Sequence, residues 1–259
     1  MFFGFSNITA AYGKKIVLKD LTLDFPKGSI TTILGANGSG KSTLLKTIPR
    51  VIKPLTGKVI LEEKPISSYS KKELSRKIGY LPQINYTPED ITVRTLVSYG
   101  RFPYRSRFGS LGSFDMQIID ETLETCRLAQ LAERKVYTLS GGERKLVWIA
   151  VILAQKPEVL VLDEPVTYLD IGHQVNILEL ITEIGKRDDL TIAMVLHDIN
   201  LAARYSDRLA VIKDEKVMAV GSPESVLTAA MMKEVFRVGA KIMTDEKHNC
   251  PFVISEKLE

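Results

Sequence analysis

The octapeptide GANGSGKS, residues 35–42, is the feature that most constrains how this chain folds. It fits the pattern G-x-x-x-x-G-K-[ST], a loop whose backbone N–H groups surround the phosphates of a nucleoside triphosphate. This pattern requires a strand before the loop and a helix after it. The β-branched run ITTIL precedes the loop and TLLKTI follows it, so the sequence predicts a nucleotide-binding α/β core.

The residue types of the loop suit phosphate chemistry. Glycines let the backbone approach an anion, and the N-terminus of the following helix is electropositive. We expect Lys41 to place a positive charge on the outer phosphates and Ser42 to offer its hydroxyl to Mg²⁺. The predicted ATP-binding residues here are Gly35, Ala36, Asn37, Gly38, Ser39, Gly40, Lys41, Ser42 and Thr43.

Short apolar runs alternate with helical patterns along much of the chain. EVLVL (158–162) and LTIAMVL (190–196) are continuous apolar runs, typical of parallel strands covered on both faces. Apolar residues at helical spacing over 171–186 predict a helix. The alternation predicts an α/β fold with a mostly parallel sheet. Further predicted strands are LTLDF (21–25), KVILE (58–62), IGYLP (78–82), RLAVI (208–212) and KVMAV (216–220).

Residues 84–155 differ in residue composition and pattern from the rest of the chain. They begin with turn formers and arginines and continue into DMQIIDETLETCRLAQLAE (115–133), which predicts an amphipathic helix. We therefore expect one domain over 1–259, with 1–83 and 156–259 forming the nucleotide-binding core and 84–155 a mainly helical insertion.

Composition restricts the class of protein. A net charge of +4 is too small to predict nucleic-acid binding. Cys126 and Cys250 are far apart and predict reduced thiols. The N-terminal residues lack the pattern of a signal peptide, and the longest strongly apolar stretch, 146–155, is too short to cross a bilayer. We expect any membrane role to depend on a partner protein.

A second motif, VLVLDE (159–164), is a buried strand that ends in Asp163 and Glu164. Phosphoryl transfer requires an acidic group near Mg²⁺ and a group that activates water. Neighbouring strand residues point to opposite faces, so we expect different roles for the two carboxylates. Asp163 is the predicted Mg²⁺ ligand and Glu164 the predicted general base.

The third motif is LSGGE, residues 139–143. Ser140 and Glu143 have the spacing of a capping box at the start of a helix. Gly141 and Gly142 also leave a bare, electropositive helix start that suits an anion. The sequence leaves both interpretations open. A nucleotide site split between this motif and the phosphate loop would be completed by a second copy of the chain.

Three single residues are candidates from their positions. His197 directly follows the predicted strand 190–196, which predicts contact with the terminal phosphate. Gln83 closes IGYLPQ and is expected near Mg²⁺ or the attacking water. Tyr12 either stacks on adenine or belongs to the core, and the sequence leaves both open.

Taken in order, these motifs resemble the ATP-binding cassette family over essentially the whole chain. Asp170, in the tripeptide YLD, extends the resemblance. It implies a P-loop NTPase-type, mostly parallel sheet core with an antiparallel β subdomain and an inserted helical subdomain. It also implies that two copies pair head to tail around two ATP molecules, with Ser140 and Gly142 on the γ-phosphate and Asp170 bridging the sites. The implied catalytic residues are Glu164, His197, Gln83 and Lys41, and the implied Mg²⁺ ligands are Ser42, Gln83 and Asp163.

A finer similarity is to the ATPases of iron-siderophore, haem and cobalamin importers, carried by residues 92–111, 197–227, 231–243 and 252–255. It implies an ATP-hydrolysing subunit at the cytoplasmic face of the inner membrane, with the permease docked on 84–112. An extracytoplasmic binding protein would act only indirectly, and no nucleic acid is implied. The aromatic residues of 84–112 either line this dock or pack internally. They are Tyr86, Tyr99, Phe102, Tyr104 and Phe108.

Departures from the family pattern are modest. Arg144 and Lys145 follow LSGGE, where relatives often carry Gln and then Arg. Two other functions stay open at this point: a soluble cassette ATPase outside transport, and the ATPase of a zinc, manganese or export system.

Overall fold

The computed structural model describes residues 1–86, 89–105 and 110–257. The chain forms two compact units. Unit 1 comprises Met1–Ser68 and Gly185–Glu259, and unit 2 comprises Tyr69–Ile184. The subdomain boundaries expected from the sequence divide the chain differently and stay a prediction.

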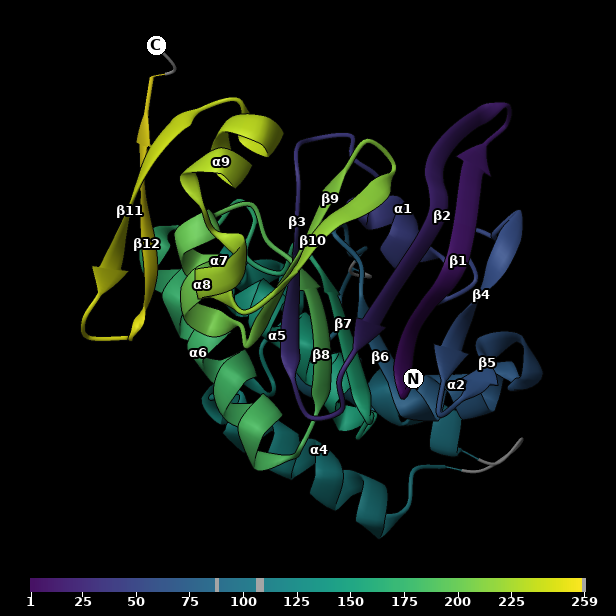
Figure 1. The fold of residues 1–259 in the computed structure, drawn as a ribbon. Coiled ribbons are helices and arrows are strands. Elements are labelled where there is room, and N and C mark those ends of the chain that lie inside the picture. The colour runs from purple at the N-terminus through teal and green to yellow at the C-terminus, as the bar shows by residue number, and fades with distance from the viewer. Residues whose placement is uncertain (87–88, 106–109, 258–259) are drawn as a thin grey trace. The chain divides into compact units, whose positions relative to one another are not determined.

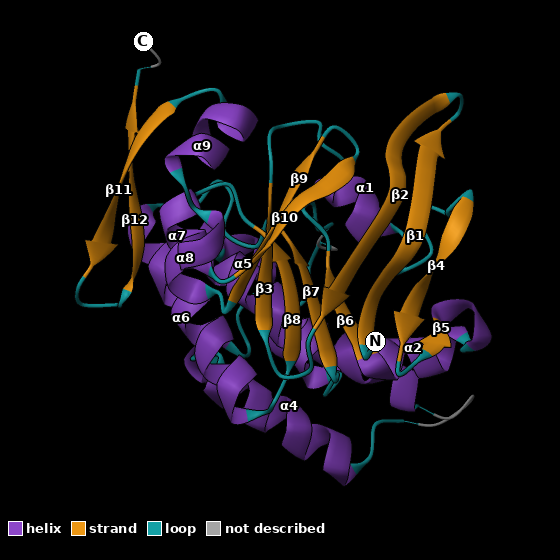
Figure 2. Ribbon diagram, viewed as in Figure 1, coloured by secondary structure: helices purple, strands orange, loops and turns teal. Residues whose placement is uncertain are grey.

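Unit 1 contains an antiparallel sheet with the strand order β2-β1-β4-β5 (Figures 1 and 2). Its core is aromatic: Phe3, Phe5 and Phe25 are buried, and the rings of Phe3 and Phe25 stack with centroids 5.2 Å apart. The first strand was not predicted from the sequence. The bounds are β1 (Phe3–Tyr12), β2 (Lys15–Phe25), β4 (Thr56–Leu61) and β5 (Lys64–Pro65).

A second sheet contributes four strands to unit 1, in the order β10-β9-β3-β8. β3 runs parallel to both β8 and β9, and Ile33 pairs with Val195 and with Ala210. Every residue of β3 and β8 is buried, as the β-branched run ITTIL and the apolar run LTIAMVL predict. The loops that follow β3 and β8 therefore leave the same edge. The bounds are β3 (Ile30–Leu34), β8 (Thr191–Val195), β9 (Arg208–Lys213) and β10 (Lys216–Gly221).

Unit 1 ends in a hairpin, β11–β12, which the sequence reading missed. The side chain of Asn200 joins it to α7, because its amide donates to the carbonyl of Val253 (3.1 Å) and accepts from the same residue's N–H (2.7 Å). The remaining bounds in unit 1 are α1 (Lys41–Lys46), η1 (Ile66–Ser68), α7 (Ile199–Tyr205), α8 (Pro223–Val226), α9 (Ala229–Met231), η5 (Met232–Phe236), β11 (Gly239–Asp245) and β12 (Cys250–Glu256).

Unit 2 holds two parallel strands, in which Leu81 pairs with Leu162, and a group of helices around α5. α5 packs against α3, α4, η2 and β6. The bounds are α2 (Lys71–Lys77), β6 (Ile78–Leu81), α3 (Val93–Ser98), η2 (Tyr99–Tyr104), α4 (Ser113–Thr125), η3 (Ala129–Leu131), η4 (Val136–Thr138), α5 (Gly141–Ala154), β7 (Val159–Asp163) and α6 (Ile171–Arg187).

The helix predicted over 115–133 is wrong in its second half. α4 stops at Thr125 because Arg127 takes a left-handed backbone conformation (φ 57°). The N–H of Leu128 then donates to the carbonyl of Leu123 (2.7 Å), which closes the helix end. The apolar residues that continue the helical spacing belong to a separate short turn, η3.

Two further observations concern the cysteines of the chain and the length and apolarity of its helices. Cys126 and Cys250 are both free and buried, as the sequence predicts. Within the residues that the structure describes, no helix combines the length and the apolarity that a bilayer span requires.

Candidate nucleotide-binding and catalytic site

The phosphate loop follows β3 and leads directly into α1, as predicted. Close packing requires glycine at two positions of the loop, Gly35 and Gly40. A Cβ on Gly35 would lie 2.3 Å from the carbonyl oxygen of Ile212. Gly40 has φ 100°, and a Cβ there would lie 2.6 Å from a methyl group of Leu18. The loop is thus held tightly between β9 and β2.

Lys41 lies within this loop and is only 5% exposed. Its ammonium group donates to the carbonyl oxygens of Gly35 (2.8 Å) and Ala36 (2.9 Å). Ser42 and Thr43 follow in α1, half-buried and buried respectively. A positive charge, a hydroxyl group and loop N–H groups are therefore concentrated at one edge of the sheet in unit 1.

A cavity of about 810 Å³ opens on the loop residues 36–39. Its other walls are residues 15–17 of β2, the β9–β10 turn at 212–215 and the C-terminal residues 234–237. None of these three walls was predicted to line a nucleotide site. Residues 15–17 adjoin Tyr12 across a tight turn, which was an available signal, and 234–237 lie within 231–243, a stretch noted only for its family likeness.

Tyr12 and His197 belong to the same unit as the loop. Tyr12 ends β1, pairs with Lys15 and is 52% exposed, so it is not a core residue. His197 is exposed and follows β8, the parallel neighbour of β3. It therefore leaves the same sheet edge as Gly35.

The two predicted carboxylates lie at the end of β7 in unit 2. Asp163 is fully buried and Glu164 is 7% exposed. The strand ends at Asp163, and Glu164 takes a left-handed conformation with φ 54°. The regular strand alternation on which we based the expectation of different roles therefore ends at Asp163.

Gln83 and Glu164 are brought together. The side-chain amide of Gln83 donates to Oε2 of Glu164 (2.7 Å), and the hydroxyl of Thr167 donates to the same oxygen (3.0 Å). The contact follows from topology, because β6 and β7 are parallel and end at the same edge. Thr167 was not predicted, although its place three residues after Glu164 is a common spacing for such a bond.

LSGGE forms the predicted capping box at the start of α5. The hydroxyl of Ser140 accepts from the N–H of Glu143 (3.2 Å), and the Glu143 carboxylate accepts from the N–H of Ser140 (2.7 Å). The hydrogen bonds from Ser140, the backbone one first, hold the pKa of Glu143 below its usual range. Ser140 and Gly141 are exposed, so the helix start is both capped and accessible.

His173, which the sequence analysis missed, contacts two of the predicted residues. Its N–H donates to Oδ1 of Asp170 (2.9 Å), and its Nδ1 lies 2.6 Å from Oδ2. These contacts lower the pKa of Asp170. A Cβ on Gly142 would lie 2.1 Å from Cδ2 of the same ring. The imidazole thus packs directly on LSGGE while it holds Asp170.

Lys145, one of the departures from the family pattern, lies near the two predicted catalytic carboxylates. Burial lowers the pKa of its ammonium group, whereas the negative charges of Glu164 and Asp163 act in the opposite direction. A cation therefore accompanies the two acids in unit 2.

The aromatic residues of 84–112 divide into two groups. Tyr86 (83%), Phe102 (45%) and Tyr99 (38%) are exposed. Tyr104 packs internally, because its hydroxyl donates to a main-chain carbonyl (2.8 Å). Phe108 lies outside the residues that the structure describes.

The residues present fit the cofactors that the motifs imply. Gly38 has φ 80° and nothing within 4 Å of the place of a Cβ, so the loop backbone is bare there, as backbone binding of phosphate requires. Within unit 2, Gln83 and the buried Asp163 offer oxygen atoms, the donors that Mg²⁺ prefers, and within unit 1 Ser42 offers a hydroxyl oxygen.

Comparison with known proteins supports the family resemblance that the motifs predict. A family model described as "ABC transporter" matches residues 18–167. The chain is 44% identical to the iron(3+)-hydroxamate import ATP-binding protein FhuC of Bacillus subtilis, over 95% of this chain and 92% of the relative. It is 41% identical to the petrobactin import ATP-binding protein FpuD of Bacillus anthracis, over 96% and 91%.

Solved structures extend the likeness to the fold. A structure described as an inward-facing metal-chelate type ABC transporter has a TM-score of 0.84 and 25% identity, over 98% of both chains. The dimeric, post-hydrolysis structure of the cassette MJ0796 with ADP and Pi has a TM-score of 0.73 and 29% identity, over 85% of this chain and 98% of that one. The predicted fold class is confirmed.

Proposed function

Since this chain belongs to the ABC transporter family, we propose that it is the ATPase that drives a membrane importer of ferric chelates of the siderophore class. The observation that carries the enzymatic part is the hydrogen bond from Gln83 to the buried carboxylate of Glu164. The cargo class rests on the relatives named for petrobactin and iron(3+)-hydroxamate import. Because those two cargoes differ, the proposal names a class and no single chelate.

The phosphate loop and its surroundings bind ATP. Backbone N–H groups of residues 35–43 and the ammonium of Lys41 neutralise the phosphates, and the exposed ring of Tyr12 stacks on adenine. Ser42, Asp163 and Gln83 would hold Mg²⁺, which would supply charge neutralisation on the transferred phosphoryl group.

Glu164 accepts a proton from the attacking water. Two donors, Gln83 and Thr167, hold one of its oxygens, so the carboxylate keeps a fixed direction. Its burial limits competing contacts with bulk water. His197 contacts the terminal phosphate from the same sheet edge as the phosphate loop.

A second copy of the chain completes each site. Ser140, Gly141, Gly142 and Glu143 contact the γ-phosphate bound by the partner copy, and Asp170 bridges the two sites. The accessible, capped start of α5 supports this role, as does the dimeric form of the cassette neighbour. ATP favours the closed pair, and hydrolysis removes that preference.

The permease docks on residues 84–112, where Tyr86, Tyr99 and Phe102 present exposed rings. The chain is then peripheral, at the cytoplasmic face of the membrane. An extracytoplasmic binding protein affects it only through the permease.

The test is a pull-down of tagged Glu164→Gln chain from source membranes with ATP and Mg²⁺, read by mass spectrometry. We expect a multi-span permease in the catch, in an amount that falls when ATP is omitted. Glu179→Gln, at an exposed position of α6, is the control. Recovery of only soluble partners or nucleic acid would overturn the transport role. The chain would then be assigned as an ATPase that acts outside transport.

A further inference from the structure

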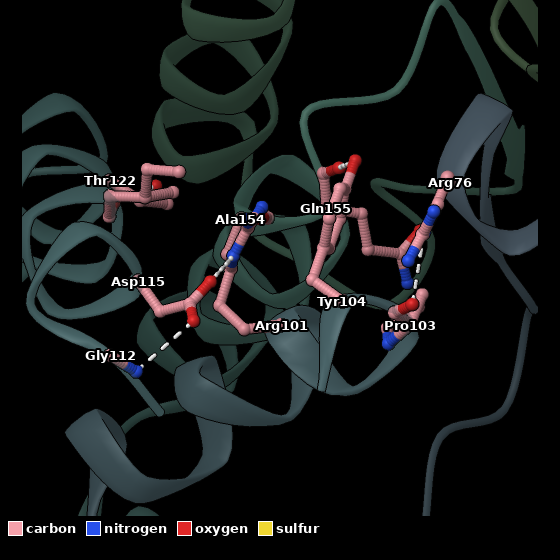
Figure 3. Close-up of polar contacts among 10 residues, drawn as sticks. Arg76, Arg101, Pro103, Tyr104, Gly112, Asp115, Thr122, Ala154 and Gln155 are labelled. Atoms are coloured by element: carbon pink, nitrogen blue, oxygen red, sulfur yellow. Dashed lines mark hydrogen bonds and ion pairs between the residues drawn. The ribbon is translucent and has the colours of Figure 1, made fainter. Parts of the chain in front are cut away.

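Arg101 is a buried cation that the catalytic account does not use. It is 2% exposed, in the interior of unit 2 (Figure 3). Its Nε lies 2.9 Å from Oδ1 of Asp115, and its guanidinium carbon lies 3.8 Å from the centre of the Tyr104 ring. Burial of a charge is costly unless the charge is paired and hydrogen-bonded. All of the contacts named here hold the guanidinium in one orientation.

Arg101 and Tyr104 together close the C-terminal end of α5. Nη1 of Arg101 donates to the carbonyl of Ala154 (2.8 Å), and the Tyr104 hydroxyl donates to the carbonyl of Gln155 (2.8 Å) (Figure 3). Carbonyls at a helix end have no partner inside the helix, and a cation there is favourable. The helix end is therefore held by side chains of η2.

The backbone of η2 is also pressed against α5. A Cβ on Gly100 would lie 2.1 Å from the carbonyl oxygen of Val151. From the other direction, Arg76 of α2 donates to the carbonyl of Pro103 (2.9 Å) and lies over the Tyr104 ring at 4.9 Å. η2 thus has little room to move without moving the end of α5.

The opposite end of α5 is LSGGE. A helix of 14 residues spans roughly 21 Å. Ser140 and Glu143 fix its N-terminal end through the capping box, and η2 fixes its C-terminal end. One stiff element therefore connects the exposed aromatic segment with the motif that faces ATP.

We propose that Arg101 and Tyr104 are positioning residues that transmit permease movement from η2 through α5 to LSGGE. This inference rests on the proposed function, in which the permease docks on residues 84–112. Neither residue belongs to the predicted ATP-binding or catalytic set. Their effect is to keep the helix end attached to the docking segment, so that displacement of the segment displaces LSGGE.

Two variants separate transmission from folding. Tyr104→Phe keeps the ring and removes only the bond to the Gln155 carbonyl. Arg101→Lys keeps the charge but loses the planar fork that reaches Asp115 and Ala154 together. Tyr137→Phe is the matched control, because Tyr137 lies in the same unit and is 63% exposed.

The experiment compares these chains, each assembled with the co-purified permease in lipid vesicles, using a ferric trihydroxamate siderophore as the probe. Iron transported per ATP hydrolysed is the readout, with KM for ATP and Tm measured on the same chains. For Tyr104→Phe we expect a KM for ATP within about twofold of wild type and a Tm within a few degrees of it. We expect the ratio of iron transported to ATP hydrolysed to fall roughly fivefold, which corresponds to the free energy of one hydrogen bond. The control keeps the wild-type ratio.

An unchanged ratio in both folded variants would overturn the inference. The inference would also be overturned if the ratio of iron transported to ATP hydrolysed fell only in step with Tm and recovered when the assay was cooled. That result would mean a purely structural role for the two residues. A wild-type complex in which neither the permease nor the siderophore affects ATP hydrolysis would instead overturn the proposed function, and the inference with it.

Discussion

The side-chain amide of Gln83 donates a 2.7 Å hydrogen bond to the carboxylate of Glu164, a residue 81 positions later in the chain. Two parallel strands that end at one edge produce this contact. Glu164 lies in a left-handed turn and is 7% exposed, and the hydroxyl of Thr167 donates to the same carboxylate oxygen. The pairing gives the proposed base a fixed direction and connects it with the segment that leads to the proposed dock.

Removal of the base should stop hydrolysis without stopping binding. In Glu164→Gln we expect kcat to fall by roughly 10²–10⁴, the usual contribution of a general base. ATP affinity should stay close to wild type, because the phosphate loop is untouched. Single-turnover hydrolysis and equilibrium binding of a fluorescent ATP analogue measure the two effects. Near-normal turnover in this variant would remove Glu164 from the base role.

Loss of the orienting donor should have a smaller effect. In Gln83→Ala we expect kcat to fall roughly tenfold, since the remaining donor, Thr167, still holds Oε2 of Glu164. Gln130→Ala, at an exposed position of unit 2, is the control. If Gln83→Ala and Gln130→Ala hydrolyse ATP at equal rates, the hydrogen bond has no catalytic consequence.

The phosphate role of Lys41 can be separated from general charge effects. Lys41→Ala should weaken ATP binding at least tenfold and abolish measurable turnover, because it removes the cation held inside the loop. Lys46→Ala, at the other end of α1, removes a charge outside the loop and should bind ATP normally. Equal affinities in the two variants would contradict the assignment.

Much of this fold could be predicted from the sequence, because the central strands are continuous apolar runs with motifs at their ends. β3 matches its predicted bounds, residues 30–34, and β8 and β9 agree within one residue at each end. β1 was missed because its apolar residues are interrupted by small and polar ones, and its register with β2 shifts at several points. The end of α4 was missed because a left-handed residue stops a helix whose apolar spacing continues.

The sequence predicted the motifs of the site, but not the contacts between their side chains. The sequence indicated Gln83, Glu164 and the capping box, whereas the Gln83–Glu164 bond depends on which strands are neighbours. The burial of Arg101 runs against the ordinary expectation that arginine is exposed. The packing of His173 on Gly142 is a tertiary contact with no local signal. The family assignment is confirmed, and the individual residue roles stay predictions.

The capping box should give a pH-dependent contribution to stability. The folded-state pKa of Glu143 is lowered by its hydrogen bonds with Ser140, so its contribution is present above the unfolded pKa, about 4.3, and is lost as pH falls further. Glu143→Gln keeps the cap and removes the charge. Because Glu143 is only half-buried and solvent weakens its interactions, we expect the difference in unfolding free energy to be below ~1 kcal/mol at pH 7 and to vanish near pH 3. Denaturant unfolding at both pH values measures it. A difference that does not change with pH would contradict the assignment.

The contact between Gly142 and His173 should appear as a coupling energy. Gly142→Ala places a methyl group in the space of the imidazole, and His173→Ala removes that obstacle. We expect the destabilisation by Gly142→Ala to be smaller in the His173→Ala background, with a coupling of about 1 kcal/mol or more. A four-point cycle of denaturant unfolding measures this energy. Strict additivity would show that the two residues do not meet.

The central claim is that ATP hydrolysis by this chain drives ferric-chelate import. The most direct test is iron uptake by vesicles that contain the permease complex, measured together with ATP hydrolysis, for the wild-type chain and for Glu164→Gln. We predict that a ferric siderophore stimulates hydrolysis by the wild-type complex, that iron accumulates, and that Glu164→Gln loses both activities. Equal uptake with Glu164→Gln, or hydrolysis that no ferric chelate changes, would contradict the account.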